Sequence, residues 1–102
     1  MPVGKRNALA EAQQYLQYEA FSYKGLIAQL DSQYGGQFSV ADATWAADHV
    51  GADWNAEAVK AARQYLQTQP FSHAALVQQL SSPYGGQFTR AQAEYGATQA
   101  GD

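Results

Sequence analysis

Few residues in this 102-residue chain are of a type that performs chemistry. There is no cysteine, and the two histidines, His49 and His73, are not accompanied by a paired-acid or nucleophile motif. A zinc site needs several His, Cys or carboxylate ligands at set spacing, and that spacing does not occur. The pair Gly35-Gly36 lacks the pattern and the preceding strand of a phosphate-binding loop. We therefore expect no enzyme activity, no catalytic residue, no metal and no cofactor.

The charge balance disfavours a nucleic-acid partner. Six Lys and Arg stand against nine Asp and Glu, which gives a formal net charge of −3. Affinity for DNA or RNA depends on neutralising phosphates with basic side chains. No apolar run approaches the roughly 18 residues that a membrane-spanning helix needs. These features leave a protein-binding role as the main class to consider.

Aromatic and acidic side chains are the candidates for such a binding surface. Aromatic residues make up 13% of the chain, and seven of them are tyrosine. Most fall where a core would form, but two lie about 100° around their predicted helices from the alanine stripe. Tyr and Trp are favoured at protein interfaces because they are large and amphipathic. Our candidate contact residues are Trp45, Tyr95, Asp42, Asp48 and Glu94.

The elements that carry these residues occur twice. Residues 7–52 align with residues 57–102 without a gap, and nearly half of the aligned positions are identical. A repeat of this length implies one supersecondary unit in each copy. We predict a disordered lead over 1–6, a first repeat over 7–52, a short stiff join over 53–56 and a second repeat over 57–102.

Each repeat has the pattern of three short helices. Ala8, Ala12, Tyr15 and Leu16 share one helical face, and the same spacing recurs 50 residues later. No segment alternates with a period of two, so strands are not expected. The sequence predicts an all-α fold, built as a tandem repeat of two three-helix modules that resemble a helix-turn-helix.

Helix ends have their own signals. All four phenylalanines directly precede a Ser or Thr, which can cap the helix that follows by accepting a bond from a free backbone N–H. Asp53 or Asn55 can cap the fourth helix. We expect Gly35-Gly36 and Gly85-Gly86 to end the second helix of each repeat by adopting positive φ. We also expect Pro83 to end the fifth helix a residue or two early.

The helix-turn-helix plan raises the possibility of a DNA-binding regulator. Such a reader needs basic and amide side chains on its third helix. Residues 39–50 hold no Lys or Arg, and residues 89–100 hold only Arg90. DNA binding is therefore the least favoured alternative, and no nucleic-acid partner is expected.

Two repeated motifs carry a family resemblance. Each copy reads Tyr-Leu-x4-Phe-Ser-x3-Leu-Ile/Val-x-Gln-Leu and then Tyr-Gly-Gly-Gln-Phe-Ser/Thr. Together with the join Val50–Asn55, these motifs resemble the Ltp-type host cell surface-exposed lipoprotein repeat. The resemblance extends from about residue 7 to residue 102. It implies tandem helix-turn-helix modules joined by a stiff linker.

The resemblance also implies superinfection exclusion. In that role a prophage-encoded lipoprotein stays on the host surface and stops DNA injection by an incoming phage, with the tape measure protein of that phage as its target. The family pattern includes a signal peptide and a lipid-bearing cysteine, which this chain does not contain. We therefore expect membrane association only through an upstream lipid anchor, which would place a monomer at the extracellular face of the bacterial membrane. The alternative is a cell-envelope interaction domain of a bacterial surface protein.

Overall fold

The structure is a computed structural model that describes residues 3–101. Over that range it contains six helices and no strand, which confirms the predicted all-α fold of two three-helix modules. The helices are α1 (Val3–Tyr18), α2 (Tyr23–Asp31), α3 (Val40–His49), α4 (Trp54–Thr68), α5 (His73–Ser81) and α6 (Arg90–Gly101). In the part of the chain described, no helix combines the length and apolarity needed to cross a membrane.

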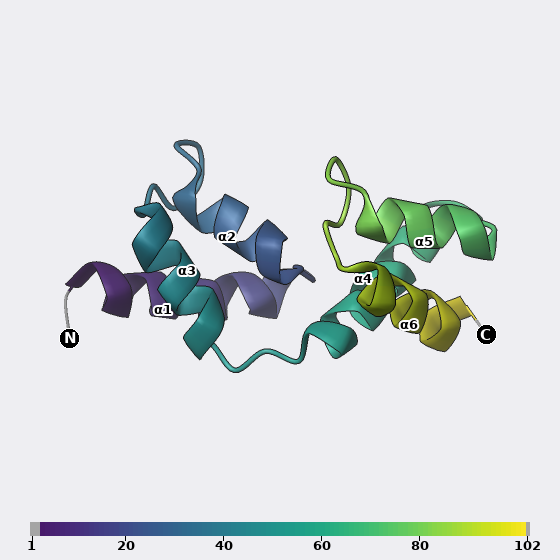
Figure 1. Ribbon diagram of the computed structural model, residues 1–102, viewed down its shortest axis with the longest axis horizontal. Helices are drawn as coiled ribbons and strands as arrows, with labels where there is room; N and C mark the ends of the chain where they lie inside the picture. The colour runs from purple at the N-terminus through teal and green to yellow at the C-terminus, as the bar shows by residue number, and fades with distance from the viewer. Residues whose placement is uncertain (1–2, 102) are drawn as a thin grey trace.

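The two modules lie one after the other along the long axis of the molecule. Figure 1 shows α1 to α3 at one end and α4 to α6 at the other, and the whole measures 44 × 23 × 21 Å. In each module the first and third helices pack together, and the second helix lies across them. The arrangement within a module is that of a helix-turn-helix preceded by a longer helix.

Each module has a core of its own. Leucines on α2 and α5 fill the space between helices whose buried positions are mainly alanine, so the helix backbones approach closely. The core of the first module contains Ala8, Ala12, Leu26, Leu30, Ala43, Ala46 and Ala47. The core of the second contains Ala58, Ala61, Ala62, Leu76, Val77, Leu80, Phe88, Ala93 and Ala97.

The predicted helix caps are confirmed. Ser22, Ser39 and Ser72 each accept a hydrogen bond from the backbone N–H three residues later, at 2.9, 3.1 and 3.0 Å. Thr89 and Gln92 form the full capping box, because each side chain accepts from the other's backbone N–H at 3.1 Å. Each cap satisfies a donor that the helix itself leaves free, and contributes about 1 kcal/mol.

The glycine pairs do not have the positive φ that we expected. The residues with positive φ in these turns are Gln37, at 59°, and Gln87, at 60°. A side chain is excluded at these glycines because carbonyl oxygens of the preceding helix approach them closely. A Cβ on Gly36 would lie 2.7 Å from the carbonyl oxygen of Leu30, and one on Gly35 would meet that of Gln29.

Helices α2 and α5 end at equivalent positions, Asp31 and Ser81, so the expected early end before Pro83 is wrong. Ser82 precedes the proline and is extended, with ψ of 139°. Ser32 has the same ψ with no proline after it. The serine therefore ends the helix in both modules.

The chain is helical earlier than expected at its start. Helix α1 includes Val3–Arg6, so the disordered lead predicted over 1–6 is wrong for these four residues, while residues 1 and 2 lie outside the described part. The sequence offers no cap here, and packing on α3 holds the first turn instead. The Lys5 Nζ lies 5.8 Å from the centre of the Trp45 ring, a cation–π contact.

The connection between the modules is also shorter than expected. Asp53 caps α4 by accepting from the backbone N–H groups of Asn55 and Ala56, both at 3.1 Å. Residues 54–56 of the predicted join are therefore the first turn of α4. Gly51, with φ of 73°, turns the chain just after α3.

Candidate protein-binding surface

The structure divides the five candidate contact residues between the two modules. Asp42, Trp45 and Asp48 lie on α3, whereas Glu94 and Tyr95 lie on α6. The Trp45 ring stacks on His49 with ring centres 4.2 Å apart, so it is half-buried. Tyr95 is 46% exposed. Among the described residues no hydrogen bond or ion pair joins the two groups, which belong to different modules.

Two of the acidic candidates are held by neighbours within the chain. The Tyr23 hydroxyl donates to Asp48 at 2.7 Å, and this hydrogen bond raises the pKa of Tyr23. Glu94 binds the His73 ring at 3.1 Å and Arg90 Nε at 3.2 Å. The bond with His73, followed by that with Arg90, lowers the pKa of Glu94. Glu94 is therefore paired with two neighbours of its own module, while its side chain stays 44% exposed.

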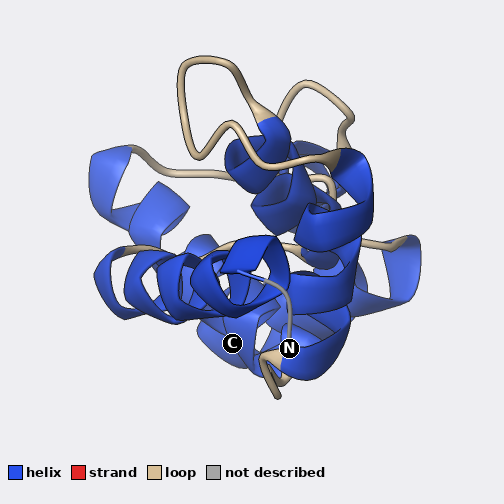
Figure 2. Ribbon diagram, turned by 90° about the vertical axis from the view of Figure 1, so that its left-hand side faces the viewer, coloured by secondary structure: helices blue, strands red, loops and turns tan. Residues whose placement is uncertain are grey.

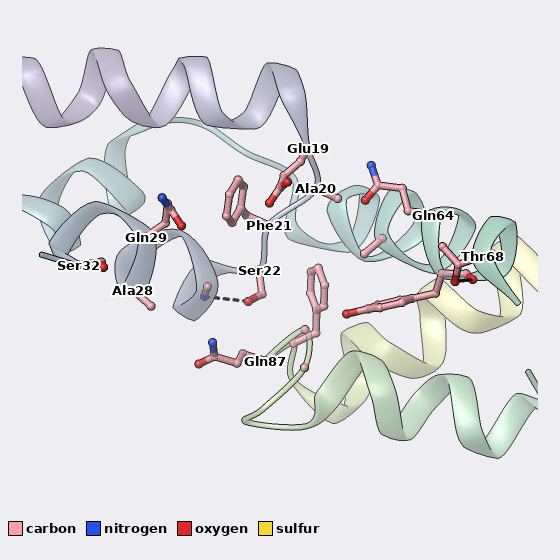
Figure 3. Close-up of a pocket in the computed structure, with 16 residues that line it drawn as sticks. Glu19, Ala20, Phe21, Ser22, Ala28, Gln29, Ser32, Gln64, Thr68 and Gln87 are labelled. Atoms are coloured by element: carbon pink, nitrogen blue, oxygen red, sulfur yellow. Dashed lines mark hydrogen bonds between the residues drawn. The ribbon is translucent and has the colours of Figure 1, made fainter. Parts of the chain in front are cut away.

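A cleft with a volume of about 530 Å³ lies between the modules. Figure 3 shows its walls, and we call it the inter-module cleft. One wall is the chain from Glu19 to Ser22 with the exposed side of α2, and the other is α4 with the Gly85–Phe88 segment. None of the five candidate residues lines it.

Several contacts join the two modules. The backbone N–H of Phe21 donates to Glu57 on α4 at 3.1 Å, and Glu57 is only 8% exposed. The rings of Tyr23 and Trp54 meet edge to face, with centres 5.7 Å apart. Ala20 also packs on the second core. The short connection and these contacts together set the orientation of one module against the other.

The residues that line the cleft can form hydrogen bonds, but they carry little charge. Gln29, Gln64 and Gln87 bring amide groups to it, Ser22 adds a hydroxyl, and Glu19 is the charged residue among those lining it. Side-chain amides both donate and accept, so they can pair with the backbone of an inserted polypeptide. In residues 3–101, no three His, Cys, Asp or Glu side chains cluster as a metal site would need.

The sequence did not reveal this cleft because its walls come from segments far apart in the chain. Residues 19–32, 61–68 and 85–88 meet only when the modules are placed against each other. Each of these stretches also has a local role in a cap, a helix or a turn. The one signal available beforehand was the abundance of glutamine, which suits a polar and uncharged binding face.

We predict that Glu57→Ala loosens the orientation of the modules without unfolding either one. The substitution leaves the Phe21 N–H without its acceptor, so this amide should exchange with solvent at least about tenfold faster in NMR hydrogen exchange. Glu57→Gln keeps an oxygen acceptor and should retain most of the protection. Asn7 is the equivalent of Glu57 in the first repeat, and Asn7→Ala is the matched control. Unchanged exchange of the Phe21 amide in Glu57→Ala would contradict this assignment.

The chain is similar to known proteins both in sequence and in fold. The family model described as "Host cell surface-exposed lipoprotein" matches residues 4–50 and 53–99, one match for each repeat. The chain is 31% identical to a solved structure, described as Ltp, a superinfection exclusion protein from the Streptococcus thermophilus temperate phage TP-J34. That match has a TM-score of 0.85 and covers 96% of each chain. No curated protein sequence gives a significant match.

Proposed function

Because this chain belongs to the family of host cell surface-exposed lipoproteins, we propose that it acts in superinfection exclusion by binding a protein of an incoming phage. The similarity to Ltp over nearly the whole chain carries the proposal, since both repeats and their connection are shared. The role is one of binding and not of catalysis. The cleft supports a binding role because its lining offers amide and hydroxyl groups for hydrogen bonds.

The proposed partner is the tape measure protein of the incoming phage. A module held at the outer face of the membrane by a lipid anchor would meet phage proteins before DNA reaches the cytoplasm. Binding there would stop DNA injection while leaving adsorption of the phage unaffected. The net charge of −3 favours a partner segment that carries basic side chains.

We propose the inter-module cleft as the principal contact surface. Its amide groups, on Gln29, Gln64 and Gln87, can pair with the backbone of a polypeptide segment. The two faces that carry Trp45, Tyr95, Asp42, Asp48 and Glu94 are proposed as secondary contacts. Of these residues, Tyr95 has an exposed ring and is uncharged, so a partner that covers it need not neutralise a charge.

The test of this function combines a cell assay with a binding assay. The chain is displayed on cells with a lipoprotein signal and anchor, and phage adsorption and DNA entry are measured separately. We expect normal adsorption and blocked DNA entry. The purified chain should bind at least one tape measure fragment in titration calorimetry. Absence of both protection and binding would remove the proposal.

Two other outcomes would favour the alternatives considered from the sequence. Binding of DNA in a gel shift at low salt, without binding of tape measure fragments, would support a regulator. The one basic residue of α6, Arg90, is paired with Glu94, which does not favour that outcome. Binding to a bacterial envelope component, without phage protection, would support a cell-envelope interaction domain.

A further inference from the structure

Each module has an exposed tyrosine in the connection between its second and third helices. We call residues Gln33–Gln37, between α2 and α3, the first tip, and residues Pro83–Gln87, between α5 and α6, the second tip. Tyr34 is 92% exposed and Tyr84 is 99% exposed. Figures 1 and 2 show the connections that carry both tips projecting from the same side of the molecule. Two large rings are thus offered to solvent in one direction.

Both tips are held by the same dense set of hydrogen bonds. In the first tip, the backbone N–H groups of Gly35 and Gln37 both donate to the Ser32 carbonyl, at 3.1 and 2.9 Å. The Ser32 hydroxyl accepts from the Tyr34 N–H at 3.1 Å. The second tip repeats these three bonds on Ser82, at 3.0, 3.1 and 3.1 Å. These bonds hold the backbone of each tip in the same conformation, in which the tyrosine is exposed.

The rings contribute little to the fold. A single exposed apolar side chain needs no explanation. Here the same residue occupies the same rigid turn twice, on one side of the molecule. A partner that covers rigid tyrosines gains large contact area at a small cost in conformational entropy.

The two tips differ in charge. A shallow hollow at the first tip is lined by Asp31, Gln33, Tyr34 and Gln37. Asp31 makes no ion pair within residues 3–101, and no Lys or Arg occurs in residues 29–39. A free carboxylate beside an aromatic face suits a Lys or Arg side chain. The second tip has Pro83 in place of Gln33 and no charged residue, so it suits an apolar surface.

We propose that the two tips bind one protein segment at two points. A basic side chain of that segment contacts Tyr34 and Asp31, and an apolar surface of it contacts Tyr84. The inference rests on the proposed function, because it names the residues that hold the phage protein. Both tips adjoin the inter-module cleft, since Ser32, the residue before the first tip, and Gly85–Gln87 of the second tip line it. We expect a segment bound in the cleft to extend beyond it to the two rings.

The experiment uses the tape measure fragment that the wild-type chain binds, and measures Kd by titration calorimetry. We expect Tyr34→Ala and Tyr84→Ala each to raise Kd about tenfold, and the double variant to raise it about 100-fold. Asp31→Asn should reduce the dependence of Kd on salt. Val3→Ala is the control, because Val3 is 62% exposed at the start of α1, does not line the cleft, and should leave Kd unchanged.

The outcomes separate this inference from the proposed function. Tyr34→Ala, Tyr84→Ala and the double variant should melt at the wild-type temperature, because both rings are more than nine-tenths exposed. Wild-type Kd in the double variant would overturn the role of the tips and leave the proposed function standing. A wild-type chain that binds none of the fragments would overturn both.

Discussion

Gly96→Ala should destabilise the second module by about 2 kcal/mol, although alanine is the better helix former. Replacing a helical glycine by alanine ordinarily gains about 1 kcal/mol. At Gly96, however, a Cβ would lie 2.7 Å from the carbonyl oxygen of Ala58 and 2.9 Å from its Cβ. Those atoms belong to α4, so the two helices must separate, and such overpacking costs about 3 kcal/mol. The steric cost exceeds the gain in helix propensity.

The measurement is chemical denaturation followed by circular dichroism. Gly101→Ala provides the matched control on the same helix, since a Cβ there would meet no atom within 4 Å. That variant should be as stable as wild type or slightly more stable. The equivalent of Gly96 in the first module is Ala46, which is fully buried with its methyl group in place. Equal stability of Gly96→Ala and Gly101→Ala would show that α4 and α6 are not in this close contact.

Leu80→Ala should destabilise the second module by about 2–5 kcal/mol and split unfolding into two transitions. Leu80 is fully buried, and its truncation removes apolar contacts and leaves a cavity. The two cores share no buried residue, so the loss is confined to α4–α6. The first module should then unfold at nearly its wild-type temperature, after the second has melted.

Differential scanning calorimetry checks this splitting, and NMR identifies which module melts first. Leu30 occupies the equivalent position in the first module and is also fully buried. Leu30→Ala should therefore produce the reverse order of unfolding. A single cooperative transition in both variants would mean that the contacts between the modules, including Glu57 with Phe21, couple the two cores more strongly than we expect.

The relation between the modules matters for function because it sets the distance between the tips. Each tip is rigid within its own module, so their spacing depends on the connection Val50–Asp53 and on the bond between Phe21 and Glu57. A partner that contacts both tips would lose affinity if that orientation were loosened. Glu57→Ala is thus expected to weaken two-point binding as well as to expose the Phe21 amide.

Local features of the fold could be predicted because their physical causes are local. A hydroxyl directly before a helix caps the free N–H groups three residues away, and this requires no knowledge of the rest of the chain. Ser22, Ser39, Ser72 and Thr89 all behave in this way. The helix periodicity and the repeat likewise gave the six helices and their grouping into two modules.

The candidate site could not be predicted in the same way. Contacts at Trp45 and Glu94 stay predictions; the structure adds that Trp45 is stacked on His49 and that Glu94 is paired with Arg90 and His73. The exposed Tyr34 and Tyr84 were not selected, because a tyrosine in a repeated motif has the same pattern whether it faces the core or solvent. The role of the glycines also depended on carbonyls of a preceding helix.

The amino-acid sequence by itself determined the helices, their caps, the duplication and the family, since these follow from neighbours within a few residues and from repeated motifs. The tertiary structure alone decided which side chains are free. Exposure and pairing depend on residues that are distant in the chain, such as Glu57 beside Phe21 or Glu94 beside His73. The inter-module cleft and the common direction of the two tips exist only because the modules are held in one orientation.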